Sequence, residues 1–288
     1  MDTKIYFTAD VFGMCGGVHA ALDTLEKLVD SSGDGVYVFN ELVHNRSVTE
    51  SFVRKGVKFV SNTEDIPFGV PLVIGAHGVS PEVEKALRSR ASQCLDATCP
   101  LVKKLHHIAE SVPGADELII FGKSGHPEVQ GVAGYSGTEK LFIISEPAEA
   151  IQLPELKRPV FISQTTVDHE EVEKVLTLLK ERFPNLRESS GICDASKKRQ
   201  AAVVALAEKV EVVLVIGSNH SSNAKRLREI AERSGCRAYL IDNAAELFPA
   251  MLDCRRIGVT GGASTPQYLF DEVITALEKA GFNNGKEL

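Results

Sequence analysis

The sequence contains no tryptophan, only three methionines and few aromatic residues, which make up 6% of its 288 residues. Its longest apolar run, residues 201–207, is far shorter than the roughly 20 residues that span a bilayer, so we expect no transmembrane helix and no membrane partner. Basic residues are outnumbered, 32 against 39 acidic ones, and the net charge is -7. This balance argues against nonspecific binding to a nucleic-acid backbone.

Residues 1–13 lack the basic region and apolar stretch of a signal peptide, so we expect a cytoplasmic protein in a reducing compartment. Disulfide bonds are not expected there, and the six cysteines are interpreted as buried thiols, catalytic thiols or metal ligands. No GxGxxG motif opens a strand-turn-helix unit, which argues against a bound NAD(P) or flavin. The composition, 43% hydrophobic and 25% charged, is that of an ordinary globular protein.

A repeat of about ninety residues organises the chain. Cys15, Cys99 and Cys193 are each followed by a helix-like stretch (18–29, 100–111 and 196–209) and then by an apolar strand-like run (35–40, 117–122 and 211–217). Each unit continues with a polar loop, a second helix-like stretch, a second strand (71–78, 158–166 and 255–264) and a third helix (80–89, 168–183 and 265–279). Alternating strands and helices favour mostly parallel sheets.

The repeat predicts three similar α/β lobes, 10–98, 99–192 and 193–288, with pseudo-threefold symmetry around a centre. Short segments, 92–99 and 188–193, lead from the third helix of units one and two to the next cysteine. Unit three has no such segment, whereas residues 4–15 lead into Cys15. We therefore expect the amino-terminal strand 3–9 to complete the third lobe.

Polar loops follow the strands, at the sheet edge where α/β proteins bind ligands. If the lobes share a threefold axis, Cys15, Cys99 and Cys193 converge there. Three thiolates leave one metal position open, which favours a reactive [4Fe-4S] cluster over a structural site. The loop residues that would surround it are His44, His77, His126, Glu128, Thr165, Thr166, Ser221, Asn223 and Ser264.

The loops also indicate the ligand. Gly-rich turns before helices, at 217–223 and 261–266, present backbone amides and hydroxyls that hold phosphate, and the histidines add donors. The substrate is therefore expected to be small, anionic and phosphorylated. His126 and Glu128 lie two residues apart after a strand end, where a carboxyl sequestered beside a metal can deliver protons and the hydroxyls of Thr165 and Thr166 can relay them.

Nine ordered motifs resemble one family. They are GMCGGV, ELVHN, GAHGVSPEV, DATCPLVKK, GHPEV, SQTT, SGIC, GSNHSSNAKRLREIA and GVTGGASTPQYL, spread from about residue 13 to residue 270. In this order they are similar to those of the LytB family, the 4-hydroxy-3-methylbut-2-enyl diphosphate reductases. The resemblance implies the last step of the methylerythritol phosphate route to isoprenoids. In that step an iron-sulfur oxidoreductase removes an allylic hydroxyl with two electrons and two protons, giving isopentenyl and dimethylallyl diphosphates.

The resemblance also implies roles for individual residues. The cluster ligands fall on Cys15, Cys99 and Cys193, and the proton-supplying carboxylate falls on Glu128, with the substrate hydroxyl on the fourth iron. A ferredoxin- or flavodoxin-type partner would deliver the electrons. The substrate contacts fall on His44, His77, His126, Thr165, Thr166, Ser221, Ser222, Asn223 and Ser264.

Some positions depart from the family pattern: Ala20 where Arg is usual, Gly261 where Ala is common, Lys123 and Ser124 where His is often seen, and DASKKRQ after the third cysteine. None is a proposed ligand.

Three alternatives remain open: a three-lobed [4Fe-4S] dehydratase or condensing enzyme resembling quinolinate synthase, a redox sensor or electron carrier, and a zinc-binding structural protein. Cys94, Cys236 and Cys254 are interpreted as structural thiols. The remaining histidines, His19, His106, His107, His169 and His220, lie mostly on predicted helices or exposed loops.

Overall fold

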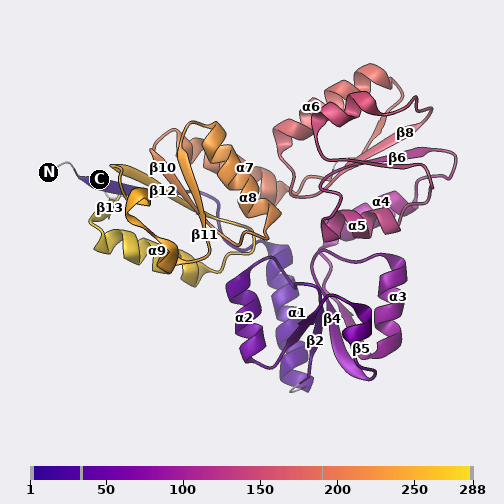
Figure 1. Ribbon diagram of the computed structural model, residues 1–288, viewed down its shortest axis with the longest axis horizontal. Helices are drawn as coiled ribbons and strands as arrows, with labels where there is room; N and C mark the ends of the chain where they lie inside the picture. Colours follow the sequence, from indigo (N-terminus) through magenta and orange to yellow (C-terminus); the bar gives the residue numbers. More distant parts are fainter. Residues whose placement is uncertain (1–2, 33–34, 190, 286–288) are drawn as a thin grey trace. The chain divides into compact units, whose positions relative to one another are not determined.

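The computed structural model describes residues 3–32, 35–189 and 191–285. Ser190, in the segment before the third cysteine, and residues 286–288, at the end of the expected third lobe, lie outside the described residues. Within the described residues the strands form three sheets, one of five strands and two of four. In Figure 1 helices lie beside each of these sheets.

The five-stranded sheet comprises β1 (Lys4–Thr8), β10 (Val212–Ile216), β11 (Arg237–Ile241), β12 (Arg256–Gly261) and β13 (Phe282–Asn284). The helices of this region are α7 (Asp194–Ala207), α8 (Ser222–Arg233) and α9 (Gln267–Lys279), with the short 3₁₀ turns η3 (Ala244–Glu246) and η4 (Pro249–Met251).

One four-stranded sheet comprises β2 (Tyr37–Phe39), β3 (Lys58–Val60), β4 (Val70–Ile74) and β5 (Ala91–Asp96). Its chain segment contains α1 (Gly16–Ser32), α2 (Arg46–Arg54), η1 (Thr63–Asp65) and α3 (Pro81–Arg90).

The other comprises β6 (Glu117–Phe121), β7 (Leu141–Ile144), β8 (Pro159–Ser163) and β9 (Arg187–Glu188), with α4 (Pro100–Glu110), α5 (Pro127–Gly134), η2 (Pro147–Gln152) and α6 (His169–Arg182).

All three sheets have one connectivity. Their orders are β11-β10-β12-β1-β13, β3-β2-β4-β5 and β7-β6-β8-β9, so in each the first strand of the repeat lies between the second and third, and a fourth strand follows the third. Every strand pair in these sheets is parallel. The predicted fold class, three α/β lobes with mostly parallel sheets, is confirmed. The amino-terminal strand β1 pairs with β12 and β13, at the place that β5 and β9 take beside β4 and β8.

Side-chain alternation along the central strands explains the layers. Val213 and Val215 of β10 pack with apolar residues of α7 and α8, whereas Leu214 and Ile216 pack with those of α9. Because successive side chains of a strand point to opposite faces, a strand covered on both faces is apolar throughout. All five residues of β10 are buried for this reason.

The β6 sheet follows the same rule. Leu118 and Ile120 pack with α4 and α5, and Ile119 and Phe121 pack with α6. Several helices in this half of the chain begin at a proline directly after a polar loop, as α3 does at Pro81 and α5 at Pro127. Proline suits the first helical position because its missing N–H has no intrahelical acceptor there. The loops that carry the candidate residues are thus held between a buried strand and a helix start.

The chain divides into two compact units. The first comprises Met1–Val18, His44–Glu50 and Asp194–Leu288, and the second comprises His19–Val43 and Ser51–Cys193. The five-stranded sheet belongs to the first unit and both four-stranded sheets belong to the second. The lobe boundaries 10–98, 99–192 and 193–288 stay a prediction. Among the helices of the described residues, none is both long enough and apolar enough to cross a membrane.

Candidate active site

Cys99 lies between the end of β5 and the first residue of α4, Pro100. Its backbone N–H donates to the carbonyl of Ala76 at 3.0 Å, so the cysteine is tied to the turn that carries His77. Asp96 supports the same loop, because its Oδ1 accepts from the N–H of Thr98 at 2.9 Å and its Oδ2 lies 2.6 Å from Nζ of Lys103. Partial burial acts to raise the pKa of Asp96, but the hydrogen bonds from Lys103 and Thr98 outweigh it and hold the pKa below its usual value.

Cys193 is tied to the turn after β8. Its backbone N–H donates to the carbonyl of Thr165 at 3.1 Å. Two residues earlier, Gly191 packs directly on β8, and a Cβ atom at this position would lie 1.9 Å from the carbonyl oxygen of Ser163. Only glycine permits so close an approach. The position of Cys193 therefore depends on the missing side chain of Gly191.

Glu128 and Thr165 form a buried hydrogen-bonded pair. Glu128, on the first turn of α5, is 2% exposed and Thr165 is 7% exposed. Oε1 of Glu128 accepts from the backbone N–H of Thr165 at 2.6 Å, and Oε2 accepts from the Thr165 hydroxyl at 2.8 Å. Both carboxylate oxygens are thus bonded to one residue, which is itself bonded to Cys193.

Thr166 has a different partner. Its hydroxyl accepts from Nε2 of Gln164 at 3.1 Å, and Oε1 of Gln164 accepts from the N–H of Lys123 at 3.1 Å. The structure therefore distinguishes the two adjacent threonines: Thr165 bonds to the buried carboxylate, and Thr166 bonds to a glutamine amide.

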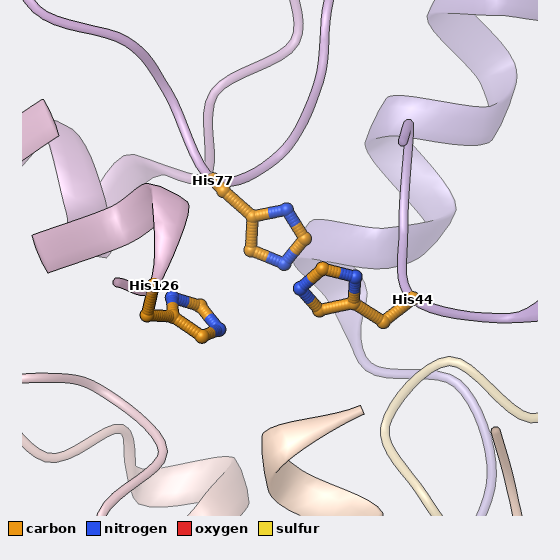
Figure 2. A group of neighbouring side chains, drawn as sticks. All are labelled: His44, His77 and His126. Atoms are coloured by element: carbon orange, nitrogen blue, oxygen red, sulfur yellow. The ribbon is translucent and has the colours of Figure 1, made fainter. Parts of the chain in front are cut away.

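His77 and His126 follow strands of two different sheets in the second unit: His77 lies in the turn after β4, and His126, after β6, caps α5 (Figure 2). Their ring centroids lie 5.5 Å apart and the rings are nearly perpendicular, at 83°. Nδ1 of His126 accepts from the N–H of Glu128 at 3.2 Å, so the neutral ring carries its proton on Nε2. His126 can therefore donate to an anion through Nε2. Figure 2 also draws His44, which belongs to the first unit.

In the first unit, the Cys15 loop is held through its backbone. The N–H of Cys15 donates to the carbonyl of Ala263 at 3.0 Å. The carbonyl of Gly13, a residue with a φ of 77°, accepts from the guanidinium of Arg199, a buried residue of α7. The neighbouring turn is joined to the ELVHN segment, because the hydroxyl of Ser264 donates to the carbonyl of His44 at 2.9 Å.

Ser221, Ser222 and Asn223 lie at the start of α8. Ser221 caps the helix, and its hydroxyl accepts from the N–H of Ala224 at 3.2 Å. Asn223 is buried, yet within the described part of the chain its Nδ2 has no hydrogen-bond partner. A Cβ atom added to Gly262 would lie 3.7 Å from this nitrogen, so the amide faces the glycine turn that precedes Ser264. Leaving a buried donor unpaired costs about 1–3 kcal/mol, and a hydrogen-bond acceptor placed beside Asn223 would remove this cost.

The candidate residues fall into two sets. The second unit contains His77, Cys99, His126, Glu128, Thr165, Thr166 and Cys193, and the first contains Cys15, His44, Ser221, Ser222, Asn223 and Ser264. Three supporting residues escaped the sequence analysis: Gln164, Gly191 and Arg199. The first two lie inside the SQTT and SGIC motifs, which is the signal that could have found them. Arg199 gave none, because most arginines on helices face solvent.

The other three cysteines have the environment of structural thiols. Burial raises the pKa of Cys94 and Cys236, and it raises the pKa of Cys254 to about 11. The thiol of Cys236 also lies 3.3 and 3.2 Å from the carbonyl oxygens of Ala207 and Val210. A thiol that resists ionisation is a poor metal ligand, which agrees with the interpretation of these cysteines as structural thiols.

The repeated parallel sheets define a three-lobed α/β protein with cysteines and a buried acid–hydroxyl pair after its strand ends. The family model of the LytB protein matches residues 7–278. The chain belongs to the LytB family. It is 40% identical over 288 residues to a 4-hydroxy-3-methylbut-2-enyl diphosphate reductase of Rhodococcus jostii, covering 98% of this chain and 85% of the relative.

Other relatives agree. The chain is 36% identical to the enzyme of the same name from Neisseria meningitidis, covering 100% of this chain and 91% of the relative. Among solved structures, the E-1-hydroxy-2-methyl-but-2-enyl-4-diphosphate reductase of Plasmodium falciparum matches with a TM-score of 0.92 and 27% identity, covering 98% of this chain and 92% of that one. A structure of (E)-4-hydroxy-3-methyl-but-2-enyl diphosphate reductase matches with a TM-score of 0.66 and 29% identity, covering 96% of this chain and 100% of that one.

Proposed function

We propose that this protein is a 4-hydroxy-3-methylbut-2-enyl diphosphate reductase. The allylic C–O bond breaks, two electrons and one proton are added to the carbon fragment, and a second proton leaves with the oxygen as water. The fragment accepts its proton at either end of the allyl group, which gives isopentenyl and dimethylallyl diphosphates. The observation that carries this proposal is the buried Glu128–Thr165 pair bonded to the Cys193 segment, in a chain that belongs to the LytB family.

The donor set fits a [4Fe-4S] cluster. Cys15, Cys99 and Cys193 are partly buried, and each follows a sheet strand. Thiolates are the ligands that such clusters prefer, and three of them leave one iron open for a substrate oxygen. When bound, the cluster supplies electrons and a Lewis-acidic iron that polarises the C–O bond.

Seven side chains are proposed to bind the diphosphate, and they offer neutral donors without a basic patch. The unpaired Nδ2 of Asn223 supports this assignment, and so does the Nε2–H of His126, which the bond between Nδ1 and Glu128 fixes. Charge-assisted hydrogen bonds to phosphate oxygens are stronger than bonds between neutral groups. The seven are His44, His77, His126, Ser221, Ser222, Asn223 and Ser264.

Glu128 is proposed as the proton donor. Its two oxygens are held by one residue, so the carboxyl has a single orientation and can pass a proton through the Thr165 hydroxyl. Thr166, bonded to Gln164, is assigned to substrate orientation beside this path.

A ferredoxin- or flavodoxin-type protein is the proposed electron donor, and the cytoplasm is the proposed compartment.

The test is oxidation of reduced methyl viologen by anaerobically purified, cluster-reconstituted protein, with and without 4-hydroxy-3-methylbut-2-enyl diphosphate. We expect brown protein and substrate-dependent oxidation that yields both five-carbon diphosphates. Intact cluster without turnover would favour a dehydratase or a redox sensor. Colourless protein that retains zinc would overturn the cluster assignment.

A further inference from the structure

His106 is a buried histidine to which the sequence analysis assigned no role. It lies on α4, seven residues after Cys99, and is 5% exposed, whereas the side chain of its neighbour His107 is 80% exposed. Its ring stacks on Tyr135, with centroids 4.2 Å apart and an interplanar angle of 16°. Burial lowers the pKa of His106 to about 4, so the ring is neutral at physiological pH.

The same ring contacts both segments that carry the paired histidines. A Cβ atom on Gly78, the residue after His77, would lie 2.7 Å from Cε1 of His106. A Cβ atom on Gly131 of α5, the helix that His126 caps, would lie 3.2 Å from Nε2. Both positions are glycine, so backbone packs directly on the ring. The imidazole therefore lies between Gly78 of the His77 turn and Gly131 of the His126 helix, beside the direct contact of Gly131 with Val79.

The Nε2 edge of this ring packs without a hydrogen bond. Within the described residues Nε2 of His106 is buried without a hydrogen-bond partner, so the ring acts there through its shape. Tyr135 holds it from the other side, and the Tyr135 hydroxyl donates to Oε2 of Glu84 at 3.2 Å. A cavity of about 180 Å³ borders His106 and Tyr135, so the space left by a truncated side chain would join this cavity.

We propose that His106 is a positioning residue that sets the separation of His77 and His126, and through it the affinity for the diphosphate group. This inference rests on the proposed function, which assigns those two histidines to diphosphate binding. The 5.5 Å between the two ring centroids is short enough for both to donate to one diphosphate. Shifting either segment by about 1 Å would leave only one donor in place.

The experiment compares His106→Ala, His106→Phe and the matched control His107→Ala in cluster-reconstituted protein. Calorimetric titration with inorganic diphosphate gives Kd, and turnover of the allylic diphosphate gives KM and kcat. For His106→Ala we expect Kd and KM to rise about 10- to 100-fold while kcat changes less than about threefold. His106→Phe should restore most of the binding because it keeps a planar ring, and His107→Ala should match the wild type.

A second variant keeps the test sharp if His106→Ala fails to fold. Gly131→Ala places a methyl group 3.2 Å from Nε2, so the ring must move by a few tenths of an ångström, and diphosphate binding should weaken several-fold. A wild type that binds neither diphosphate nor substrate would overturn the proposed function and this inference together. If the wild type binds diphosphate and His106→Ala or Gly131→Ala binds it equally well, this inference alone is overturned. It is also overturned if His106→Phe fails to restore the binding that His106→Ala loses.

Discussion

Replacing Glu128 by glutamine tests the proton path with little disturbance of the fold. Glutamine has the same shape, and its Oε1 can still accept from the N–H of Thr165, now 2.6 Å from the carboxylate. Its Nε2 can donate to the Thr165 hydroxyl, which then accepts a hydrogen bond instead of donating one. The two bonds to a charged acceptor become bonds between neutral groups, and we expect a loss of about 1–2 kcal/mol of folding free energy.

The effect on turnover is expected to be much larger. An amide cannot donate the proton that leaves with the oxygen, and general acid catalysis contributes about 10²- to 10⁴-fold. Glu128→Gln should therefore retain iron and sulfide, bind substrate with nearly wild-type Kd, and lose turnover by that factor. Iron analysis, calorimetry and methyl viologen oxidation measure the three quantities. Turnover within about threefold of the wild type would remove Glu128 from the proton path.

The adjacent threonines supply a matched pair of controls. Thr165→Val removes the hydroxyl bonded to Glu128 and should lower kcat about 100-fold, whereas Thr166→Val removes a hydroxyl bonded to Gln164 and should lower it less than about tenfold. Equal losses in the two variants would contradict the assignment of Thr165 as the relay.

Three further outcomes are expected. Gly191→Ala places a Cβ 1.9 Å from the carbonyl oxygen of Ser163, so it should lower the unfolding free energy by about 1–3 kcal/mol and reduce the iron content. The control Gly125→Ala, whose Cβ would have no atom within 4 Å, should change neither quantity. Equal iron content in the two variants would refute the packing argument. Asn223→Ala removes a buried amide nitrogen that has no hydrogen-bond partner among the described residues, so thermal stability should not fall while KM rises about tenfold. A clear drop in Tm would show that the amide supports the fold. Burial lowers the pKa of His106 from 6.5 to about 4, so the unfolded chain binds this proton at a higher pH than the folded one. The contribution of the neutral His106 ring to stability is therefore complete above pH 6.5 and is lost as the pH falls toward 4. Urea midpoints in this range should decline more for the wild type than for His106→Leu.

The repeat and its secondary structure could be predicted from the sequence because both depend on local patterns. The five residues of β10 are apolar throughout, as a strand buried on both faces requires, and the predicted segment 211–217 contains the observed strand Val212–Ile216. Helix starts carry proline or a capping residue, as at Pro100 and Ser221. The sequence by itself thus determined the class of fold, the three cysteines that follow strand ends and the motifs of the LytB family.

Only the tertiary structure decided which side chains meet. Adjacent residues of a turn point in different directions, and so the SQTT motif cannot tell that Thr165 bonds to Glu128 while Thr166 bonds to Gln164. The burial of His106 beside exposed His107 depends on packing between α4, Gly78 and α5, which are far apart in the sequence. Local propensity acts over a few residues, whereas these contacts arise from the folded arrangement of distant segments, which is why they appear only in the structure.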